Sequence, residues 1–152
     1  MLKGFTLLEL VIVIAVILIL FFIIFSAFSG FNRNYALDTE AQRVASILDE
    51  ARSLTLASKG DTNYGVHFES SQVVLFTGDT YSAMDPSNRE ESLTSSVTIS
   101  DISLSGGGSD VVFARLTGAL DKNGTVTLSL VSDPAMTRTI TFELTGIITV
   151  GI

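Results

Sequence analysis

Polar residues are nearly absent from a long stretch close to the start of the chain. None occurs from Leu10 to Phe25, and only Thr6 and Glu9 interrupt the apolar residues from Phe5 to Phe25. At about 1.5 Å per residue, a helix of this length crosses a hydrocarbon core of about 30 Å. A helix also satisfies its own backbone hydrogen bonds in lipid. The pattern therefore predicts a membrane-spanning helix.

The pattern becomes amphipathic after residue 35. Small or apolar side chains recur every three or four residues, which is the spacing of one helix face: Leu37, Ala41, Val44, Leu48, Ala51 and Thr55. The intervening positions are predicted to form the polar side: Asp38, Glu40, Arg43, Asp49, Glu50 and Arg52. Gly60, after Lys59, is expected to end the helix. We predict one helix from residue 5 to about residue 58, with a membrane or filament-core half over 5–30 and an amphipathic half over 31–59.

The hydrophobic period changes to two beyond residue 63, which is typical of half-buried antiparallel strands. The alternating stretches are 64–68, 73–77, 97–104 with a bulge near Asp101, 111–113, 126–130, 140–144 and 148–152. Ser82–Ser96 is polar, contains Pro86 and is predicted to be an exposed loop. The predicted fold class is α+β: a long N-terminal helix packed on a C-terminal antiparallel β-sheet domain over residues 60–152.

Glycines and prolines separate the predicted strands. Asn123-Gly124 between two β-rich stretches predicts a tight hairpin. Gly106–Gly108 is expected to be a flexible hairpin connection, and Asp133-Pro134 and Gly146 are expected to be turns.

Composition narrows the classes of partner. The net charge is -7, and nucleic-acid affinity comes mainly from Lys and Arg, so nucleic acid is an unfavourable partner. The chain has no Cys and one His, which excludes metal sites built from several thiolate or imidazole ligands. No cofactor is predicted.

Candidate catalytic chemistry is sparse. His67 is placed on the polar side of a strand, as a surface residue. Gly106–Gly108 lacks the Lys-Ser/Thr of a phosphate loop, and Asp121–Gly124 lacks the later Glu of a calcium loop. The acidic residues beside Arg89 are expected to be a solvated loop face: Asp85, Glu90 and Glu91. With no nucleophile–base set in the sequence, we predict that the protein is not an enzyme.

Three interpretations of the N-terminus compete. The first is a plain signal anchor, and the second is a secretory signal peptide cut after Ser29, where Ala27-Phe28-Ser29 has suitable small residues. The apolar stretch is longer than the usual 7–15 residues of a signal peptide. The third is a leader cut between Gly4 and Phe5. Neither of the first two interpretations explains Glu9, and a carboxylate in a membrane span costs on the order of 2–3 kcal/mol.

The segment Gly4-Phe5-Thr6-Leu7-Leu8-Glu9-Leu10 resembles the leader of type IV pilins and type II secretion pseudopilins. The resemblance implies that a prepilin peptidase cuts after Gly4, so that residues 1–4 are a leader peptide. It implies methylation of the new N-terminal Phe5 and a role for Glu9 in subunit registration.

The C-terminal half resembles the β-domain of the minor pseudopilin H and FimT-like group. The resemblance rests on Ser105–Phe113, Leu116-Thr117-Gly118, Gly124–Leu128, Arg138–Thr141 and Gly146, with Tyr64–Phe68 as the first strand. Some FimT-like relatives capture DNA through basic C-terminal residues. The tail from Glu143 to Ile152 has no Lys or Arg, so we predict no appreciable DNA affinity.

Together, the resemblances imply a minor pilin or pseudopilin of a type II secretion pseudopilus or type IV pilus. The implied partners are other pilins, the prepilin peptidase and an assembly platform in the inner membrane. Before assembly the subunit would span the bacterial inner membrane once with its N-terminus in the cytoplasm, and afterwards it would lie in a periplasmic or extracellular filament. The alternative is a single-span membrane-anchored or secreted surface-binding domain.

Overall fold

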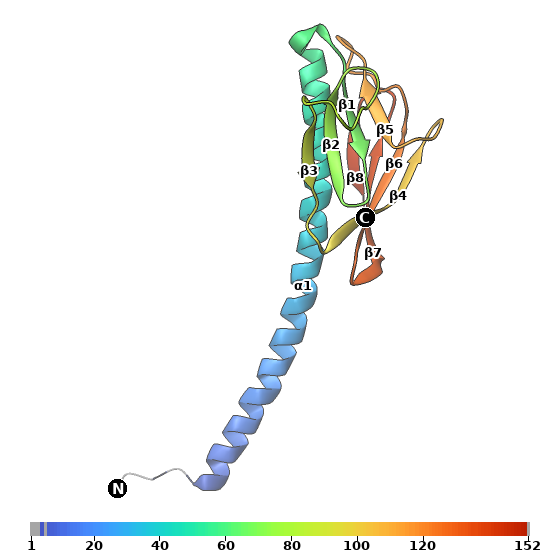
Figure 1. Cartoon of the computed structure of the whole chain (residues 1–152). Coiled ribbons are helices and arrows are strands. Elements are labelled where there is room, and N and C mark those ends of the chain that lie inside the picture. The colour runs from blue at the N-terminus through green and yellow to red at the C-terminus, as the bar shows by residue number, and fades with distance from the viewer. Residues whose placement is uncertain (1–3, 5, 152) are drawn as a thin grey trace. The chain divides into compact units, whose positions relative to one another are not determined.

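Figure 1 shows the computed structural model of the chain, which describes residue 4 and residues 6–151. One long helix, α1 (Leu7–Leu56), is followed by a short 3-10 helix, η1 (Lys59–Asp61), and by the strands β1 to β8. The chain divides into two compact units whose boundary lies within α1, between Tyr35 and Ala36. We call residues 1–35 the N-terminal unit and residues 36–152 the globular unit.

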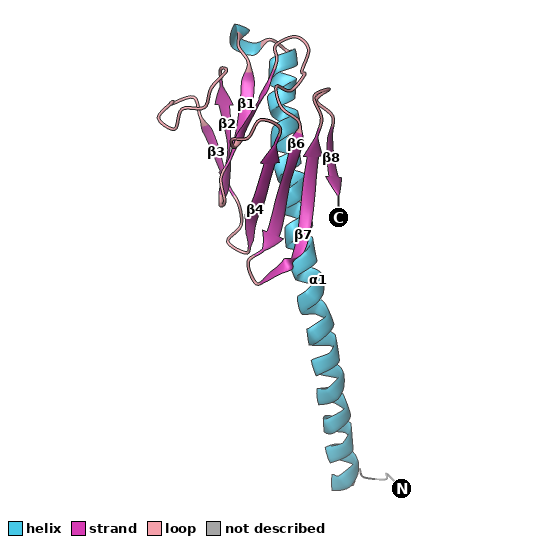
Figure 2. Cartoon of the chain, turned by 90° about the vertical axis from the view of Figure 1, so that its right-hand side faces the viewer, coloured by secondary structure: helices cyan, strands magenta, loops and turns pink. Residues whose placement is uncertain are grey.

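The strands of the globular unit form two four-stranded sheets in the described part of the chain (Figure 2). The first sheet has the order β3 (Arg89–Ser92), β2 (Gln72–Thr77), β1 (Tyr64–Phe68) and β5 (Asp110–Phe113). The second has the order β4 (Val97–Leu104), β6 (Gly124–Leu130), β7 (Asp133–Phe142) and β8 (Ile148–Gly151). All neighbouring strands are antiparallel. The predicted fold class is confirmed, and the strands are divided between two sheets.

The amphipathic stripe of α1 is the helical side of the core. All six predicted stripe residues have 0% exposure: Leu37, Ala41, Val44, Leu48, Ala51 and Thr55. Side chains from both sheets complete the same cluster, and Phe68 of β1 stacks on Phe142 of β7 with ring centroids 6.1 Å apart. The core therefore joins residues 36–56 of α1 to both sheets.

Thr55 connects the end of α1 to the first strand. Its hydroxyl donates to the Ala51 carbonyl (2.8 Å) and accepts from the Tyr64 backbone N–H (3.2 Å). Beyond Leu56 the chain reverses through Ser58 (φ 51°) and Gly60 (φ 68°). Gly60 fits this reversal because it tolerates positive φ without a steric penalty. The predicted end of the helix near residue 58 is confirmed.

The prediction of an exposed loop over Ser82–Ser96 is wrong for Arg89–Ser92, which is strand β3 and pairs with β2. Its sequence, Arg-Glu-Glu-Ser, has no hydrophobic alternation. The strand is held to α1 by charged groups, because Arg89 binds Glu50 and Arg43 binds Glu91 (2.6 Å each). Hydrophobic periodicity does not detect a strand that is stabilised in this way.

The sequence pattern places Glu40 on the solvated side of α1. In the structure the residue is buried, with an exposure of 5%. The Thr94 hydroxyl donates a hydrogen bond to one carboxylate oxygen, and an Arg43 guanidinium nitrogen lies 3.6 Å from the other. A buried carboxylate is tolerable with such partners. The segment after β3 covers Glu40. Because the tertiary structure places that segment there, the helical pattern does not reveal the burial of Glu40.

The hairpins predicted at Asn123-Gly124 and Gly106–Gly108 are also wrong. Gly124 begins β6 of the second sheet, whereas the preceding strand, β5, belongs to the first. A Cβ atom at Gly124 would lie 2.2 Å from the Ser103 carbonyl oxygen, so the glycine permits close contact with β4. Gly106–Gly108, all with positive φ, connect β4 to β5 and so cross between the sheets.

Smaller predictions are met or shifted by a few residues. The bulge near Asp101 is confirmed, because the register of β4 against β6 shifts between Ile99 and Asp101. Asp133-Pro134 is not a turn but the start of β7, and the turn lies at residues 131–132. Pro134 is tolerated there because Pro is compatible with the first residues of a strand.

Candidate functional site

The apolar part of α1 in the N-terminal unit is exposed. Leu7–Phe25 is a 19-residue stretch with a mean hydropathy of 3.5, long and apolar enough to cross a membrane, and none of it is buried. Leu7 is 82% exposed, Phe22 71% and Phe25 67%. A continuous apolar surface of this size marks an interaction with lipid or other proteins.

The start of α1 is capped by a side chain. The Thr6 hydroxyl accepts a hydrogen bond from the Glu9 backbone N–H (3.2 Å), and the Thr6 carbonyl accepts one from Leu10 N–H (3.2 Å). Thr6 is therefore the N-cap, and Glu9 is the third helical residue. Thr-x-x-Glu is the pattern of a capping box, and an acidic residue in the first turn also interacts favourably with the helix dipole.

Of the three site residues predicted from the sequence, the structure describes two, Gly4 and Glu9. Gly4 is exposed and precedes the helix, and Glu9 is exposed in its first turn. Phe5 lies outside the described residues. The capping role of Thr6 was not predicted from the sequence, although the spacing of Thr6 and Glu9 is that of a capping box. Cleavage, methylation and registration remain predictions.

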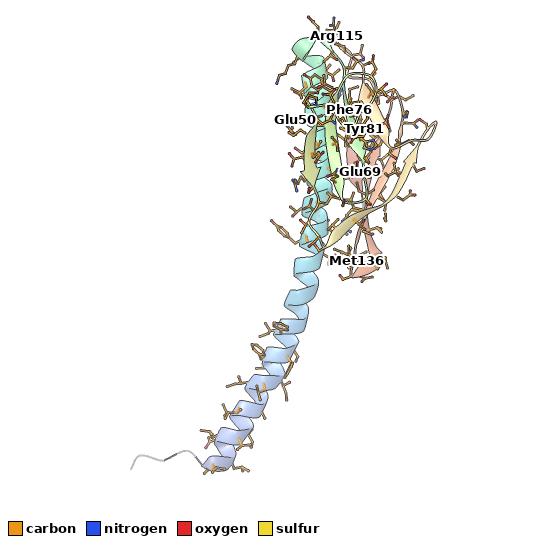
Figure 3. The ribbon with its side chains drawn as sticks, in the orientation of Figure 1. Glu50, Glu69, Phe76, Tyr81, Arg115 and Met136 are labelled. Carbon is orange, nitrogen blue, oxygen red and sulfur yellow. The ribbon has the colours of Figure 1, made fainter. Side chains whose placement is uncertain are left out.

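A network of charged groups joins α1 to β3 in the globular unit, and its member on α1, Glu50, is labelled in Figure 3. Arg89 donates to both carboxylate oxygens of Glu50 (2.6 Å each) and lies 3.3 Å from Glu91, which also binds Arg43. The hydrogen bond from Arg89 lowers the pKa of Glu50, and the same bond raises the pKa of Arg89. Each charged group of the network pairs with a group of opposite charge, so the network stabilises the attachment of β3 to α1.

The alternation along the strand predicts an exposed His67, but in the structure the residue is half-buried. Its side chain is 18% exposed, and its ring stacks on Tyr81 with centroids 3.8 Å apart. Glu69 and Asp110 each place a carboxylate oxygen 3.7 Å from a ring nitrogen. The loop after β2 brings Tyr81 over this face of the first sheet, a packing that alternation along β1 does not predict. No group of three or more potential metal ligands is found among the described residues.

A shallow depression beside β5 is lined by apolar residues and by polar side chains that already form hydrogen bonds. Its lining includes Asn63, Asp79 and Asp121. The Asn63 amide donates to the Asp79 carboxylate, and Asp121 accepts from the Val112 backbone N–H (2.8 Å). These bonds order the loop ends and cap the edge of β5. The depression shows no group poised for catalysis.

The fold of the chain resembles that of two solved structures. The type IV minor pilin FimU of Pseudomonas aeruginosa has a TM-score of 0.59 and 14% identity, covering 76% of this chain and 93% of FimU. The minor pseudopilin EpsH of the Vibrio cholerae type 2 secretion system has a TM-score of 0.55 and 12% identity, covering 76% of this chain and 95% of EpsH. No family model and no curated protein matches the sequence.

The fold is therefore that of type IV minor pilins and minor pseudopilins, as the sequence predicts. The TM-scores of 0.59 and 0.55 establish the fold, whereas identities of only 14% and 12% leave the function to be argued from the residues of this chain.

Proposed function

We propose that the protein is a structural subunit, a minor pilin or pseudopilin, of a type IV pilus or a type II secretion pseudopilus. The observation that carries the proposal is the bare apolar surface of Leu7–Phe25 on a chain with a minor-pilin fold. Such a helix is stable in lipid or among other apolar helices. A subunit that leaves the membrane for a filament exchanges the first environment for the second.

Processing at Gly4 would precede assembly. A prepilin peptidase removes residues 1–4, and Phe5 becomes the methylated N-terminus. Gly4 is exposed and precedes the helix, which supports processing at this position. In this proposal the subunit waits in the inner membrane, N-terminus in the cytoplasm, until the assembly platform and other pilins draw it into the filament.

Glu9 would set the position of each subunit. Its carboxylate and the amine freed on Phe5 each lose favourable hydration in an apolar environment, and pairing between neighbouring subunits offsets that loss. Only an axially staggered arrangement brings Glu9 of one subunit to Phe5 of the next. Because Glu9 also lies in the capped first turn, its charge and its contribution to the cap must be tested separately.

The first experiment is sequencing of the mature N-terminus after production with a prepilin peptidase. The proposal expects Phe5. A chain that begins at Met1 would be a plain anchored surface domain, and one that begins at Gly30 would be a secreted domain. Either result contradicts the proposal.

The second experiment separates charge from capping. Glu9→Gln removes the charge but keeps a residue that can complete a capping box, whereas Thr6→Ala removes the cap and keeps the charge. We expect Glu9→Gln to be lost from sheared filaments and Thr6→Ala to be largely retained. Both variants must first be shown to begin at Phe5 and to accumulate in the membrane. Wild-type incorporation of Glu9→Gln would rule out registration by charge.

A further inference from the structure

The end of the globular unit that contains the last turn of α1 exposes several large apolar side chains. Leu56 is 43% exposed, Leu116 65%, Leu144 52% and Ile147 53%. They come from α1, from the loop between β5 and β6, and from the turn between β7 and β8. We call these residues, together with Arg52, the loop-end patch.

The three segments are in direct contact. A Cβ atom at Gly118 would lie 3.1 Å from Leu56 Cδ2, and one at Gly146 would lie 2.3 Å from the Gly118 carbonyl oxygen. The Leu120 N–H donates to the Leu144 carbonyl (2.9 Å). In Figures 1 and 2 the end of α1 and the turn between β7 and β8 lie at the same end of the sheets. The patch is thus one surface built from three parts of the chain.

Arg52 lies where these segments meet. A Cβ atom at Gly146 would be 2.7 Å from Arg52 Nε, and one at Gly118 would be 3.2 Å from Arg52 Cγ. The Nε atom is buried and has no hydrogen-bond partner among the described residues. The other arginines between residues 36 and 151 each pair with a carboxylate: Arg43 with Glu91, Arg89 with Glu50, Arg115 with Asp61 and Arg138 with Asp38. Within that range, Arg52 is the arginine without such a partner.

Leu116 is held in an unfavourable conformation. Its φ is 69°, a region that residues other than glycine rarely adopt, and its side chain remains mostly in water. The fold gains little burial from this leucine, whereas a glycine would relieve the backbone. Strained residues of this kind concentrate at binding sites.

We propose that the loop-end patch binds a different protein, which inserts a carboxylate flanked by aliphatic side chains. The Arg52 guanidinium takes the carboxylate, since its planar fork matches that group. Leu116 and Leu144 cover the contact and keep water out, which strengthens the ion pair. The partner is another protein and not a second copy, because two chains of net charge -7 repel each other. The inference goes beyond the proposed function and does not depend on filament assembly.

The test uses the full chain in zwitterionic detergent micelles, with ¹⁵N-labelled arginine and two blocked tripeptides, acetyl-Leu-Glu-Leu-amide and acetyl-Leu-Gln-Leu-amide. We expect the glutamate peptide to shift the Arg52 Nε–H resonance saturably. It should bind about tenfold more tightly than the glutamine peptide, because a hydrogen bond to a charged group is stronger than one to a neutral group. Absence of a saturable shift, equal affinities, or a shift at another arginine would overturn the proposal.

Leu116→Gly provides a readout that a purely structural role would not produce. The variant should be at least as stable as the wild type, because glycine accepts φ 69°, and should bind the glutamate peptide several-fold more weakly. Met84→Gly is the matched control, because Met84 is 95% exposed outside the patch, and its loss should leave affinity unchanged. Unaltered affinity in Leu116→Gly would contradict the proposal. Because the assay uses monomeric chain, failure of processing or assembly would not affect it.

Discussion

The two halves of α1 are both helical and both rich in apolar residues, yet they differ in burial. Between Leu7 and Phe25 the large apolar side chains are at least 48% exposed, whereas the stripe from Leu37 to Thr55 is fully buried. The difference comes from the rest of the chain, since two sheets cover the second half. The comparison shows that folding buries the apolar face of the second half and leaves the apolar side chains of the first half exposed.

Truncation of one leucine in each half tests this comparison most strongly. Leu48→Ala, at 0% exposure, should lower the free energy of unfolding of the globular unit by about 2–5 kcal/mol, because it leaves a cavity. Leu18→Ala, at 52% exposure, should change it by less than about 0.5 kcal/mol. Urea unfolding of the full chain in micelles, followed by tyrosine fluorescence, measures both. Similar losses would mean that the two halves are not energetically distinct.

Substitutions at two glycines of the second sheet, Gly124 and Gly151, test the packing of the sheets that cover the second half of α1, without altering the helix itself. Gly124→Ala should destabilise the globular unit by about 1–3 kcal/mol, because the new methyl group forces β6 away from the Ser103 carbonyl. Gly151→Ala is the control, because the nearest atom to its added carbon is 3.7 Å away, and stability should hardly change. The same unfolding assay applies. A neutral Gly124→Ala would show that the contact between β4 and β6 is less tight than described.

The smallest expected effect concerns the ion pair that attaches β3 to α1. The pKa of Glu50 is lowered from 4.5 in the folded state, so its contribution is present above pH 4.5 and is lost as the pH falls through the lowered pKa. Glu50 and Arg89 are 42% and 44% exposed, so solvent screening keeps the contribution below about 1 kcal/mol. The stability advantage of the wild type over Glu50→Gln should therefore shrink between pH 7 and pH 3. A stability advantage of the wild type that grows as the pH falls would contradict a lowered pKa of Glu50 in the folded state.

Elements with a regular hydrophobic period were predictable from the sequence. The membrane-length stretch was predictable because its apolar residues are uninterrupted. The stripe from Leu37 to Thr55 and the strands with alternating apolar residues were predictable because burial on one face repeats at 3.6 or 2 residues. β3 was missed because its partners across the molecule are charged. Gly124 was misinterpreted because the sequence does not reveal whether a glycine serves a turn or a close backbone contact.

The candidate sites differ in the same way. Gly4, Phe5 and Glu9 lie within one short segment, so a local motif suffices to propose them. The loop-end patch joins Arg52, Leu116 and Ile147, which are far apart in sequence and unremarkable in their local context. Only the folded chain brings them together and shows that Arg52 differs from the paired arginines.

The sequence alone determined where apolar surface repeats, and hence the span, the helix face and most of the strands. The tertiary structure decided which strands share a sheet, which carboxylates are buried and which apolar side chains remain in water. The physical reason is the separation along the sequence of the residues involved. Periodicity is a property of neighbouring residues, whereas pairing of charges and covering of surfaces depend on residues that meet only after the chain has folded.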